Sequence, residues 1–472
     1  MSSSSDTRKI AIIGGGISGL ATAHFIRKIA KKLGRPVQID LFESEKRTGG
    51  KFDAYTDSGY TVEAGPNGFL DSKPWTLALV KDLGMESDLL PSDQSAARRF
   101  IFSRGRLHEL KASPVSFFLG GPLSIPGRLR IMGEPLASAT PKGQDTSLAE
   151  FARRRLGKEA LERLLDPMVS GIFAGDPERM SLRASFPRIA ELEEQYGGLT
   201  KAMFSIAAEK KRAKKRGEEQ GISSGPSGPG GVLTSFKKGV SQLTDRLAMD
   251  MGEHLHLNAP VRQLSVTNSN FRIHTQQESC QADGVVVATP ANNAAMILED
   301  TAPESSAVLS KIPYSPMAVV GVGYDLKDLE KPPSGFGFLI PKVENRRILG
   351  ALWTSSIFPG YRSPDGKFLI RVMTGGARDH ETPFLSDDEL LSTVKTEVAA
   401  TMNLTARPSF VTILRWKEAI PLYTVGHLDQ VAKAESTLPP GIVLAGNAYR
   451  GVGINDCVRE AEVAAEKVMK AL

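Results

Sequence analysis

Residues 8–28 read RKIAIIGGGISGLATAHFIRK, and this stretch decides the fold of the chain. The apolar run at 10–13 is typical of a strand buried in a parallel sheet, and a helical pattern follows the glycines. Between strand and helix, Gly14, Gly16 and Gly19 form G-x-G-x-x-G, which in this context is a dinucleotide-binding fingerprint. The N–H groups at the start of the helix would bind a pyrophosphate, and Gly16 would let it approach the backbone.

The next segment completes the unit. Residues 37–42 (VQIDLF) predict a second strand, and Glu43 follows at its end, 24 residues after Gly19 (43 − 19). An acid about 20 residues beyond the glycines can accept hydrogen bonds from a ribose diol. An ordinary glycine turn is the alternative, but it would not require an acid at this spacing.

A second glycine pair indicates which dinucleotide binds. Arg47, Gly49 and Gly50 form R-x-G-G shortly after Glu43, and VEAGPNGF follows at 62–69. A basic residue and a glycine pair suit a second pass of the backbone along FAD, which an NAD-only domain does not need. This stretch resembles the flavin amine oxidase superfamily, in which R-x-G-G follows the acid.

Composition narrows the class of protein. The chain has 472 residues, enough for two or three domains, and its 41% hydrophobic and 24% charged content is that of a globular protein. The net charge of +6 favours an anionic ligand or an anionic membrane surface. No nucleic-acid-binding motif accompanies the charge, so we expect no nucleic-acid partner.

The cysteines and histidines predict neither disulfides nor a metal site. Cys280 and Cys457 are the two cysteines of the chain, which favours a reducing, cytoplasmic compartment. His254 and His256 form H-x-H without further ligands nearby, and we expect a plain solvated pair.

The start of the chain imitates a targeting segment. Arg8 and Lys9 precede an uncharged stretch that ends at Ile26, as in a signal peptide. Three consecutive glycines suit an apolar membrane helix poorly, and no other segment offers about 18 uninterrupted apolar residues. We therefore expect no signal peptide and no transmembrane helix.

One apolar stretch raises the question of membrane contact. Residues 115–132 (VSFFLGGPLSIPGRLRIM) carry Arg128 and Arg130 behind an apolar run. Exposed, such a stretch binds a membrane interface; buried, it is a core loop. Residues 209–231, charged and then rich in Gly, Pro and Ser, predict a loop.

Periodicity and turn residues predict the remaining elements. We expect helices over 17–33, 74–90, 146–170 and 387–402, the last capped by Ser386, a hairpin over 99–110 turning at Gly105, and buried strands at 284–289 and 442–445.

Three further blocks make the resemblance specific. They are DPMVSGIFAGDPERMSLRASFP at 166–187, WKEAIPLYTVGH at 416–427 and AGNAYRGVGINDCV at 445–458. With the glycine motifs they resemble the oxygen-dependent protoporphyrinogen oxidase family, and the similarity runs essentially from end to end.

The resemblance implies a mixed α/β architecture. A Rossmann-like FAD-binding domain would consist of the discontinuous segments 1–90, 232–300 and 435–472. A mixed-sheet substrate domain would cover 301–434. A helical membrane-association domain would cover 95–208, followed by the loop at 209–231.

The resemblance also implies a set of site residues. Arg99 would pair with a substrate propionate, with Arg98 as the fallback. Residues that would contact the macrocycle are Gly171, through its carbonyl, and Leu339, Leu352 and Met373. Residues that would bind FAD are Gly14, Gly15, Gly16, Ile17, Ser18, Gly19, Glu43, Ser44, Arg47, Gly50, Lys51, Gly65, Pro66, Asn67, Gly68, Val261, Trp416, Gly446, Asn447, Val452, Gly453 and Ile454.

The implied activity is FAD-dependent oxidation of protoporphyrinogen IX to protoporphyrin IX in haem biosynthesis, with dioxygen as acceptor and hydrogen peroxide as product. Coproporphyrinogen III, which carries two more propionates, is the close alternative. More distant alternatives are another flavin amine oxidase, a carotenoid desaturase, or a non-enzymatic binder of prenylated GTPases, against which the block at 445–458 argues. The implied partners are porphyrinogen, dioxygen and the inner face of the cell membrane, and a homodimer is left open.

Overall fold

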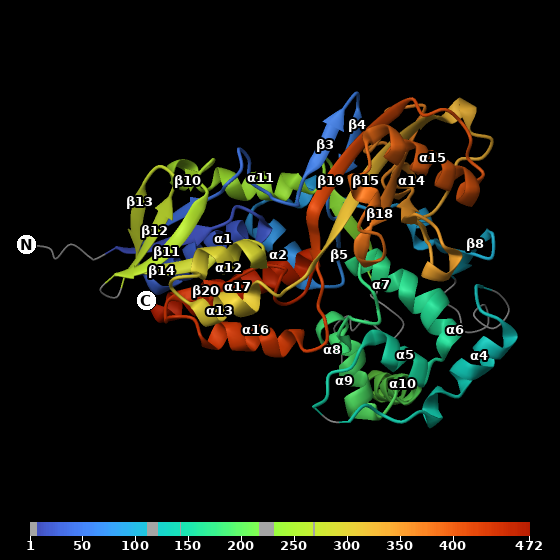
Figure 1. Ribbon diagram of the computed structural model, residues 1–472, viewed down its shortest axis with the longest axis horizontal. Helices are drawn as coiled ribbons and strands as arrows, with labels where there is room; N and C mark the ends of the chain where they lie inside the picture. The colour runs from blue at the N-terminus through green and yellow to red at the C-terminus, as the bar shows by residue number, and fades with distance from the viewer. Residues whose placement is uncertain (1–6, 111–120, 142, 217–230, 268–269) are drawn as a thin grey trace, which may run out of the picture.

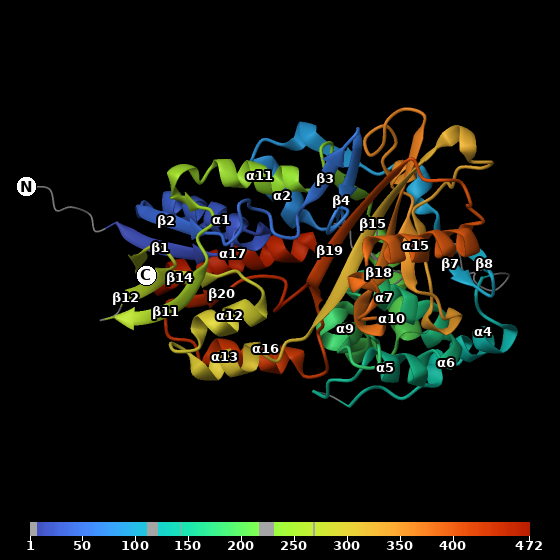
Figure 2. The same cartoon turned by 45° about the horizontal axis from the view of Figure 1, so that its top comes forward.

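The computed structural model describes residues 7–110, 121–141, 143–216, 231–267 and 270–472. Its arrangement is shown in Figures 1 and 2. A parallel sheet and its helices form one end of the molecule, a mixed sheet forms the other, and a group of helices lies beside the mixed sheet.

The glycine motif lies at the centre of the parallel sheet. Within the described ranges this sheet has five strands, in the order β10 (Leu255–His256), β2 (Val37–Phe42), β1 (Arg8–Ile13), β14 (Gly284–Val287) and β20 (Ile442–Leu444). All pairs are parallel, and every residue of β14 is buried, as expected for a strand covered on both faces. Strands from the three segments 1–90, 232–300 and 435–472 therefore meet in one sheet.

Alternation along β1 directs its side chains to two cores. Ile10 and Ile12 pack against a helical layer formed by α1 (Ile17–Leu33), α2 (Pro74–Asp82), α11 (Ser241–Met249) and α17 (Ile454–Ala471). Ala11 and Ile13 pack on the other side. That side is covered by β11 (Val261–Thr267), β12 (Asn270–Thr275), β13 (Ser279–Ala282), α12 (Ala291–Leu298), α13 (Pro303–Leu309) and α16 (His427–Ser436).

The described part of the chain also forms a seven-stranded mixed sheet. Its order is β19 (Phe410–Pro421), β15 (Tyr314–Asp325), β18 (Lys367–Gly375), β17 (Ile348–Leu352), β16 (Gly337–Leu339), β7 (Arg99–Ser103) and β8 (Arg106–Leu110). Among the described strands of this sheet, β16 and β7 pair in parallel and the other pairs are antiparallel. One face of the sheet packs against α15 (Asp387–Met402), as Figure 2 shows, so a site on this sheet has to lie on the opposite face, part of which β4 (Tyr60–Glu63) covers.

Small sheets join these two bodies. Strands β3 (Ala54–Asp57) and β4 (Tyr60–Glu63) form a hairpin, and β9 (Leu233–Phe236) pairs with β5 (Phe69–Leu70) and β6 (Leu89–Pro91). Short α14 (Thr354–Ile357) follows β17. Residues Tyr60 and Val62 of β4 pack on Val319 and Leu369 of the seven-stranded sheet.

The helical part lies between β8 and β9 in the chain. It comprises α4 (Ile125–Met132), α5 (Leu148–Arg155), α6 (Lys158–Ala160), α7 (Asp166–Phe173), α8 (Leu182–Ser185), α9 (Pro187–Tyr196) and α10 (Leu199–Lys215). Arg155 is fully buried among these helices and pairs with Glu134 (2.8 Å) and Glu193 (2.6 Å). None of the helices in the described ranges is long and apolar enough to cross a membrane.

The local predictions are confirmed where capping or turn residues define them. Helix α1 covers 17–33 as expected and ends at Gly34, which adopts a left-handed conformation. Helix α15 begins after Ser386 with a complete capping box. The hairpin β7–β8 turns at Arg104 and Gly105, both with positive φ.

Other boundaries were wrong for local reasons. The helix expected over 74–90 ends at Asp82, and Gly84 with φ +66° follows it. The helix expected over 146–170 is interrupted at Gly157, whose φ is +90°. The segment 95–208 begins with β7 and β8, which belong by their pairing to the seven-stranded sheet and not to the helices.

The histidine pair also differs from the prediction of a plain solvated pair. Both rings contact Oδ1 of Asp40, at 3.0 Å for His254 and 3.3 Å for His256. The His256 ring also stacks on Phe42. Parallel pairing of β10 with β2 brings these side chains together, which the local sequence could not show. No metal-ligand cluster occurs among the described residues.

Candidate active site

The glycine turn after β1 is built to leave space at one position. A Cβ on Gly14 would meet the carbonyl oxygen of Ala288, and a Cβ on Gly19 would collide with the carbonyl oxygen of Gly14. A Cβ on Gly16 would meet nothing within 4 Å. Ile17 and Ser18 then begin α1, which has no side-chain cap, so its first N–H groups face this open space. The turn can therefore accept an anion.

Glu43 lies directly against this turn. Its Oε2 accepts a hydrogen bond from Gly15 N (2.7 Å), and its Oε1 accepts one from Ser44 Oγ (3.1 Å). The backbone of Ala259 donates to the carbonyl of Glu43, which brings the start of β11 at Val261 close to the same strand end. The predicted ribose acid and adenine neighbour thus converge, although their ligand contacts remain predictions.

The second glycine pair runs beside the first turn. Gly49 N donates to Gly15 O (2.8 Å), and Gly49 bridges to Gly16. Arg47 donates to Gly50 O (3.1 Å) and pairs with Asp53 (2.8 Å), so its side chain stabilises the loop that contains it. A double pass of backbone therefore borders the open space at Gly16.

Lys51 extends from that second pass toward the mixed sheet. Its ammonium lies 5.3 Å from the centre of the Tyr314 ring, and burial lowers its pKa to about 8. It makes no ion pair with a described carboxylate. A cation held in this way favours a neighbouring anion.

The segment 64–68 connects the cofactor residues to the mixed sheet. Trp416 on β19 donates its indole N–H to Ala64 O (2.7 Å), and Gly65 packs so closely on Lys51 O that a Cβ would not fit. Pro66 and Asn67 are half-buried and lead to Gly68, which packs against Thr234 O. Strand β19 therefore fixes the position of this predicted FAD segment.

The C-terminal loop is held by the block 416–427. The Tyr423 hydroxyl donates to Asn447 O (2.5 Å), and Nε2 of the neutral His427 donates to Tyr449 O (3.1 Å). The two rings stack at 4.2 Å, and burial lowers the pKa of His427 to about 4. Together they hold the loop before α17 against the mixed sheet.

That loop presents a second open helix start. A Cβ on Gly446 would meet nothing within 4 Å, and Gly453 precedes α17 without a side-chain cap. Val452 and Ile454 flank Gly453. Uncapped N–H groups at this helix start favour a polar or anionic group.

The predicted substrate residues share one face of the seven-stranded sheet. Gly337 pairs with both Arg99 and Leu352, and Gly350 pairs with both Leu339 and Met373. The leucines and the methionine are only half-buried, whereas residues on the opposite face fill the core with α15.

Gly171 and the two arginines at the start of β7 lie next to these residues or among them. Gly171 on α7 packs directly against Leu339, where a Cβ would collide with the leucine side chain. Arg99 is exposed, lies 5.1 Å from the Phe336 ring and makes no ion pair with a described carboxylate. Arg98, by contrast, pairs with Glu109 at 3.1 Å.

Comparison with known proteins identifies the family to which this chain belongs. The family model for "Flavin containing amine oxidoreductase" matches residues 17–469. Coproporphyrinogen III oxidase of Staphylococcus aureus is 30% identical over 99% of this chain and 100% of its own. The chloroplastic protoporphyrinogen oxidase of Oryza sativa subsp. japonica is 31% identical over 97% of this chain and 87% of its own.

The chain belongs to the protoporphyrinogen/coproporphyrinogen oxidase family of flavin amine oxidases. A crystal structure of an Exiguobacterium protein, provisionally described as a protoporphyrinogen oxidase, matches with a TM-score of 0.83 at 25% identity, covering 99% of this chain and 100% of that one. This porphyrinogen oxidase family membership confirms the predicted FAD cofactor.

The residues present fit FAD. The open space at Gly16 and Gly446, the two uncapped helix starts and the double pass of backbone are what a dinucleotide with a ring system at one end requires. When bound, FAD supplies a two-electron acceptor that protein side chains lack.

Residues of this family member that the sequence analysis missed lie mostly between the cofactor and the mixed sheet. Tyr423 and His427 stood in a quoted block without a role. Arg371 is a charge within the apolar strand pattern FLIRVM, which was a usable signal. Glu63 and Arg362 form a buried pair across 299 residues of sequence, and no local pattern indicates it.

Proposed function

We propose that the protein is an FAD-dependent porphyrinogen oxidase of haem biosynthesis, which converts protoporphyrinogen IX to protoporphyrin IX with dioxygen and releases hydrogen peroxide. The observation that supports it is the substrate face: half-buried Leu339, Leu352 and Met373 lie together with Arg99 on one face of the sheet. The same face reaches the FAD segment 64–68 through Trp416 and Arg371.

This face matches the chemistry of a porphyrinogen. The substrate is a large apolar macrocycle with carboxylates at its rim, and it requires an apolar slot with a cation at the mouth. The three apolar side chains would hold the ring, and Arg99 would form a charge-assisted hydrogen bond to a propionate. The chain would thus position the macrocycle and exclude water, and bound FAD would supply the hydride acceptor.

Coproporphyrinogen III is the second candidate substrate, and the bacterial relatives favour it. The S. aureus relative that is named for this activity matches over nearly its whole length. The test compares hydrogen peroxide production from coproporphyrinogen III and protoporphyrinogen IX by the flavin-loaded protein. The porphyrinogen that is oxidised with the higher kcat/KM is the preferred substrate. Oxidation of neither one, by a protein with an oxidised-flavin spectrum, would contradict the proposal and favour another flavin amine oxidase.

Replacement of Arg99 by alanine should raise KM with little change in kcat. Loss of a hydrogen bond to a charged group costs about 1.5–3 kcal/mol, which corresponds to roughly 10–100-fold in kcat/KM. Arg98→Ala is the matched control, because Arg98 already pairs with Glu109. An unchanged KM in Arg99→Ala together with loss of FAD would place Arg99 in the cofactor site and contradict this assignment.

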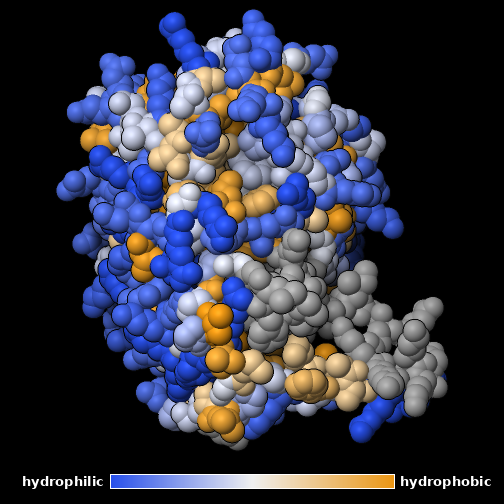
Figure 3. Space-filling model, turned by 90° about the vertical axis from the view of Figure 1, so that its right-hand side faces the viewer, coloured by the Kyte–Doolittle hydropathy of each residue, from blue (hydrophilic) through white to orange (hydrophobic). Residues whose placement is uncertain are grey.

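We also propose that the exposed end of the helical part associates with an anionic membrane surface. Ile125, Leu129, Met132 and Leu136 are between 60% and 91% exposed, and Figure 3 shows apolar side chains in the lower part of this face as well as higher on it. Such exposed apolar side chains suit insertion into the interface of a bilayer. Arg130 on the same helix donates to the carbonyls of Arg154 (2.7 Å) and Arg155 (3.1 Å), so it attaches α4 to the end of α5. The remainder of the stretch predicted at 115–132, residues 115–120, lies outside the described residues.

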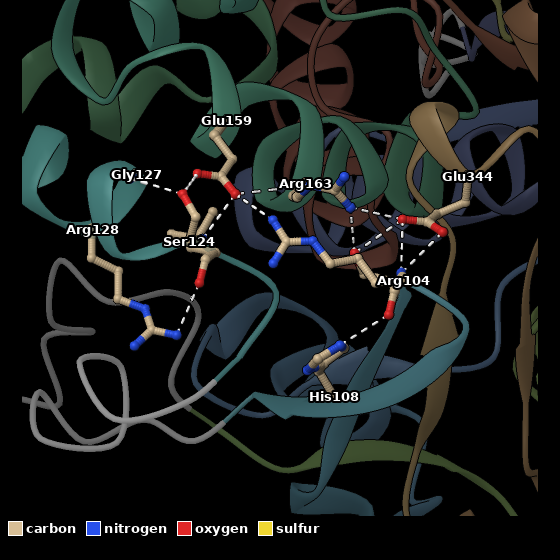
Figure 4. Close-up of polar contacts among 10 residues, drawn as sticks. Arg104, His108, Ser124, Gly127, Arg128, Glu159, Arg163 and Glu344 are labelled. Atoms are coloured by element: carbon tan, nitrogen blue, oxygen red, sulfur yellow. Dashed lines mark hydrogen bonds and ion pairs between the residues drawn. The ribbon is translucent and has the colours of Figure 1, made fainter.

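A polar network holds this patch in place (Figure 4). Ser124 caps α4 by accepting a hydrogen bond from Gly127 N (3.2 Å) and donates to Glu159. Glu159 also accepts from Arg104 (2.9 Å), and Glu344 pairs with Arg163 (2.7 Å). The start of α4 is therefore attached to the edge of the mixed sheet.

The double substitution Ile125→Asp and Leu129→Asp should reduce co-sedimentation with phosphatidylglycerol vesicles at least tenfold, because both side chains would leave the bilayer. The measurement is the fraction bound at increasing lipid concentration. Met249→Asp, on exposed Met249 of α11, serves as the control. Equal binding of the double variant and the native chain would contradict membrane contact through α4.

A further inference from the structure

Arg371 is a buried charge on the substrate face. Its partner across the strand pair is Leu352, so it lies on the same face as the predicted substrate residues, and it is only 5% exposed. Its Nη2 donates to Gly65 O (2.5 Å), and its Nη1 lies 3.5 Å from Asn67 Oδ1. Both acceptors belong to the segment 64–68, so the guanidinium connects the two halves of the site.

The charge of Arg371 is not matched by a carboxylate of its own among the described residues. The acid whose charge acts on it is Glu63, whose carboxylate contacts Arg362 (3.3 Å) and Val240 N (3.1 Å). One carboxylate thus serves two guanidinium groups. Burial raises the pKa of Glu63 to about 7 and lowers that of Arg371 to about 10, so the site keeps an excess positive charge at neutral pH.

Two hydrogen-bond donors remain free at this point. Arg371 Nε and Asn67 Nδ2 are buried without a partner in the described part of the chain. Because a guanidinium only donates, Asn67 turns its oxygen toward Arg371 and directs its NH₂ group away from it. Buried donors are normally paired, so this arrangement calls for an acceptor that a ligand supplies.

We propose that Arg371 is a positioning residue of the FAD site, which orients Asn67 as a hydrogen-bond donor to the cofactor and adds positive charge that favours FAD in its reduced state. FAD gains electrons on reduction, and a buried positive charge nearby stabilises the added negative charge. The proposal rests on the cofactor and is independent of which porphyrinogen is the substrate. Its test can therefore fail or succeed separately from the proposed function.

The test is the midpoint reduction potential of the holoenzyme, measured against a reference dye without substrate. Arg371→Met should lower the potential by at least 30 mV, equal to about a tenfold smaller ratio of reduced to oxidised FAD for a two-electron couple. Arg371→Lys keeps the charge and should retain most of the native potential. Arg415→Met is the matched control, because Arg415 pairs with Ala318 on the opposite face of the same sheet and binds loop carbonyls.

A second variant covers the case in which Arg371→Met does not fold. Asn67→Asp would place a carboxylate beside Arg371 and neutralise it, and it should lower the potential in the same direction. A potential unchanged in Asn67→Asp, or in folded and flavin-loaded Arg371→Met, would overturn the proposal. An equal fall in Arg415→Met would also overturn it, since the effect would then not depend on the face of the sheet.

Discussion

A Gly16→Val variant should fold normally and purify without flavin. A Cβ at this position meets no protein atom within 4 Å, and the backbone of Gly16 has the extended conformation that valine favours. The Cβ of the added side chain would therefore lie in the space assigned to the cofactor. We expect at least a hundredfold weaker FAD binding, or about 2.8 kcal/mol, with an unchanged melting temperature of the flavin-free protein.

The contrasting variant is Gly19→Val. Its Cβ would collide with the carbonyl oxygen of Gly14, so the variant should lose stability with or without FAD. Titration of apoprotein with FAD, followed by flavin fluorescence, separates the two cases. Native FAD affinity in Gly16→Val would show that the glycine turn does not carry the phosphates.

The Arg362→Met variant should be destabilised by about 3–5 kcal/mol, because it removes the one guanidinium that is in contact with the buried Glu63 side chain among the described residues. Both side chains are 0% exposed, and Arg362 also donates to Ser235 Oγ (3.1 Å) and Phe236 O (2.9 Å). The pair thus connects β4, β9 and the mixed-sheet part. The measurement is the free energy of unfolding from urea denaturation, together with FAD retention.

The pH dependence of this variant has a defined sign. Glu63 has a folded-state pKa of about 7, above its ordinary value of 4.5, so the folded protein already loses stability as pH rises between these values. Without the guanidinium the folded-state pKa should rise further. The stability deficit relative to the native chain should therefore widen above pH 7.

Two control variants test whether the unpaired charge of Glu63 causes the loss of stability in Arg362→Met. Arg188→Met removes an arginine from an exposed pair with Glu191 and should change stability by less than about 1 kcal/mol. Adding Glu63→Met to Arg362→Met removes the unpaired carboxylate and should restore part of the loss. If the double variant is no more stable than Arg362→Met, packing and not charge explains the defect.

Much of the cofactor half of the site could be predicted because its signals are local. The glycines at 14, 16 and 19 and the acid at the end of β2 each specify backbone geometry within a few residues. The substrate face was named through family resemblance alone. Periodicity could not indicate it, since Leu339, Leu352 and Met373 have the pattern of ordinary core residues.

Long-range pairing accounts for what was missed. The 12-residue strand β19 was not predicted, although it carries Trp416 and leads to Tyr423. Arg371 and Gly65 are separated by 306 residues, so no window of sequence contains both. The helices predicted over 74–90 and 146–170 were too long. Glycines with positive φ, Gly84 and Gly157, end or interrupt them although the apolar period continues.

The sequence by itself determined the dinucleotide fingerprint, the local turns and helix caps, and the family. Their turns, caps and apolar periods act over short distances and need no partner segment. Only the tertiary structure showed that Arg371 of β18 contacts the segment 64–68, and that Arg362 pairs with Glu63. Strand register and burial place those charges, and both depend on contacts between residues hundreds of positions apart.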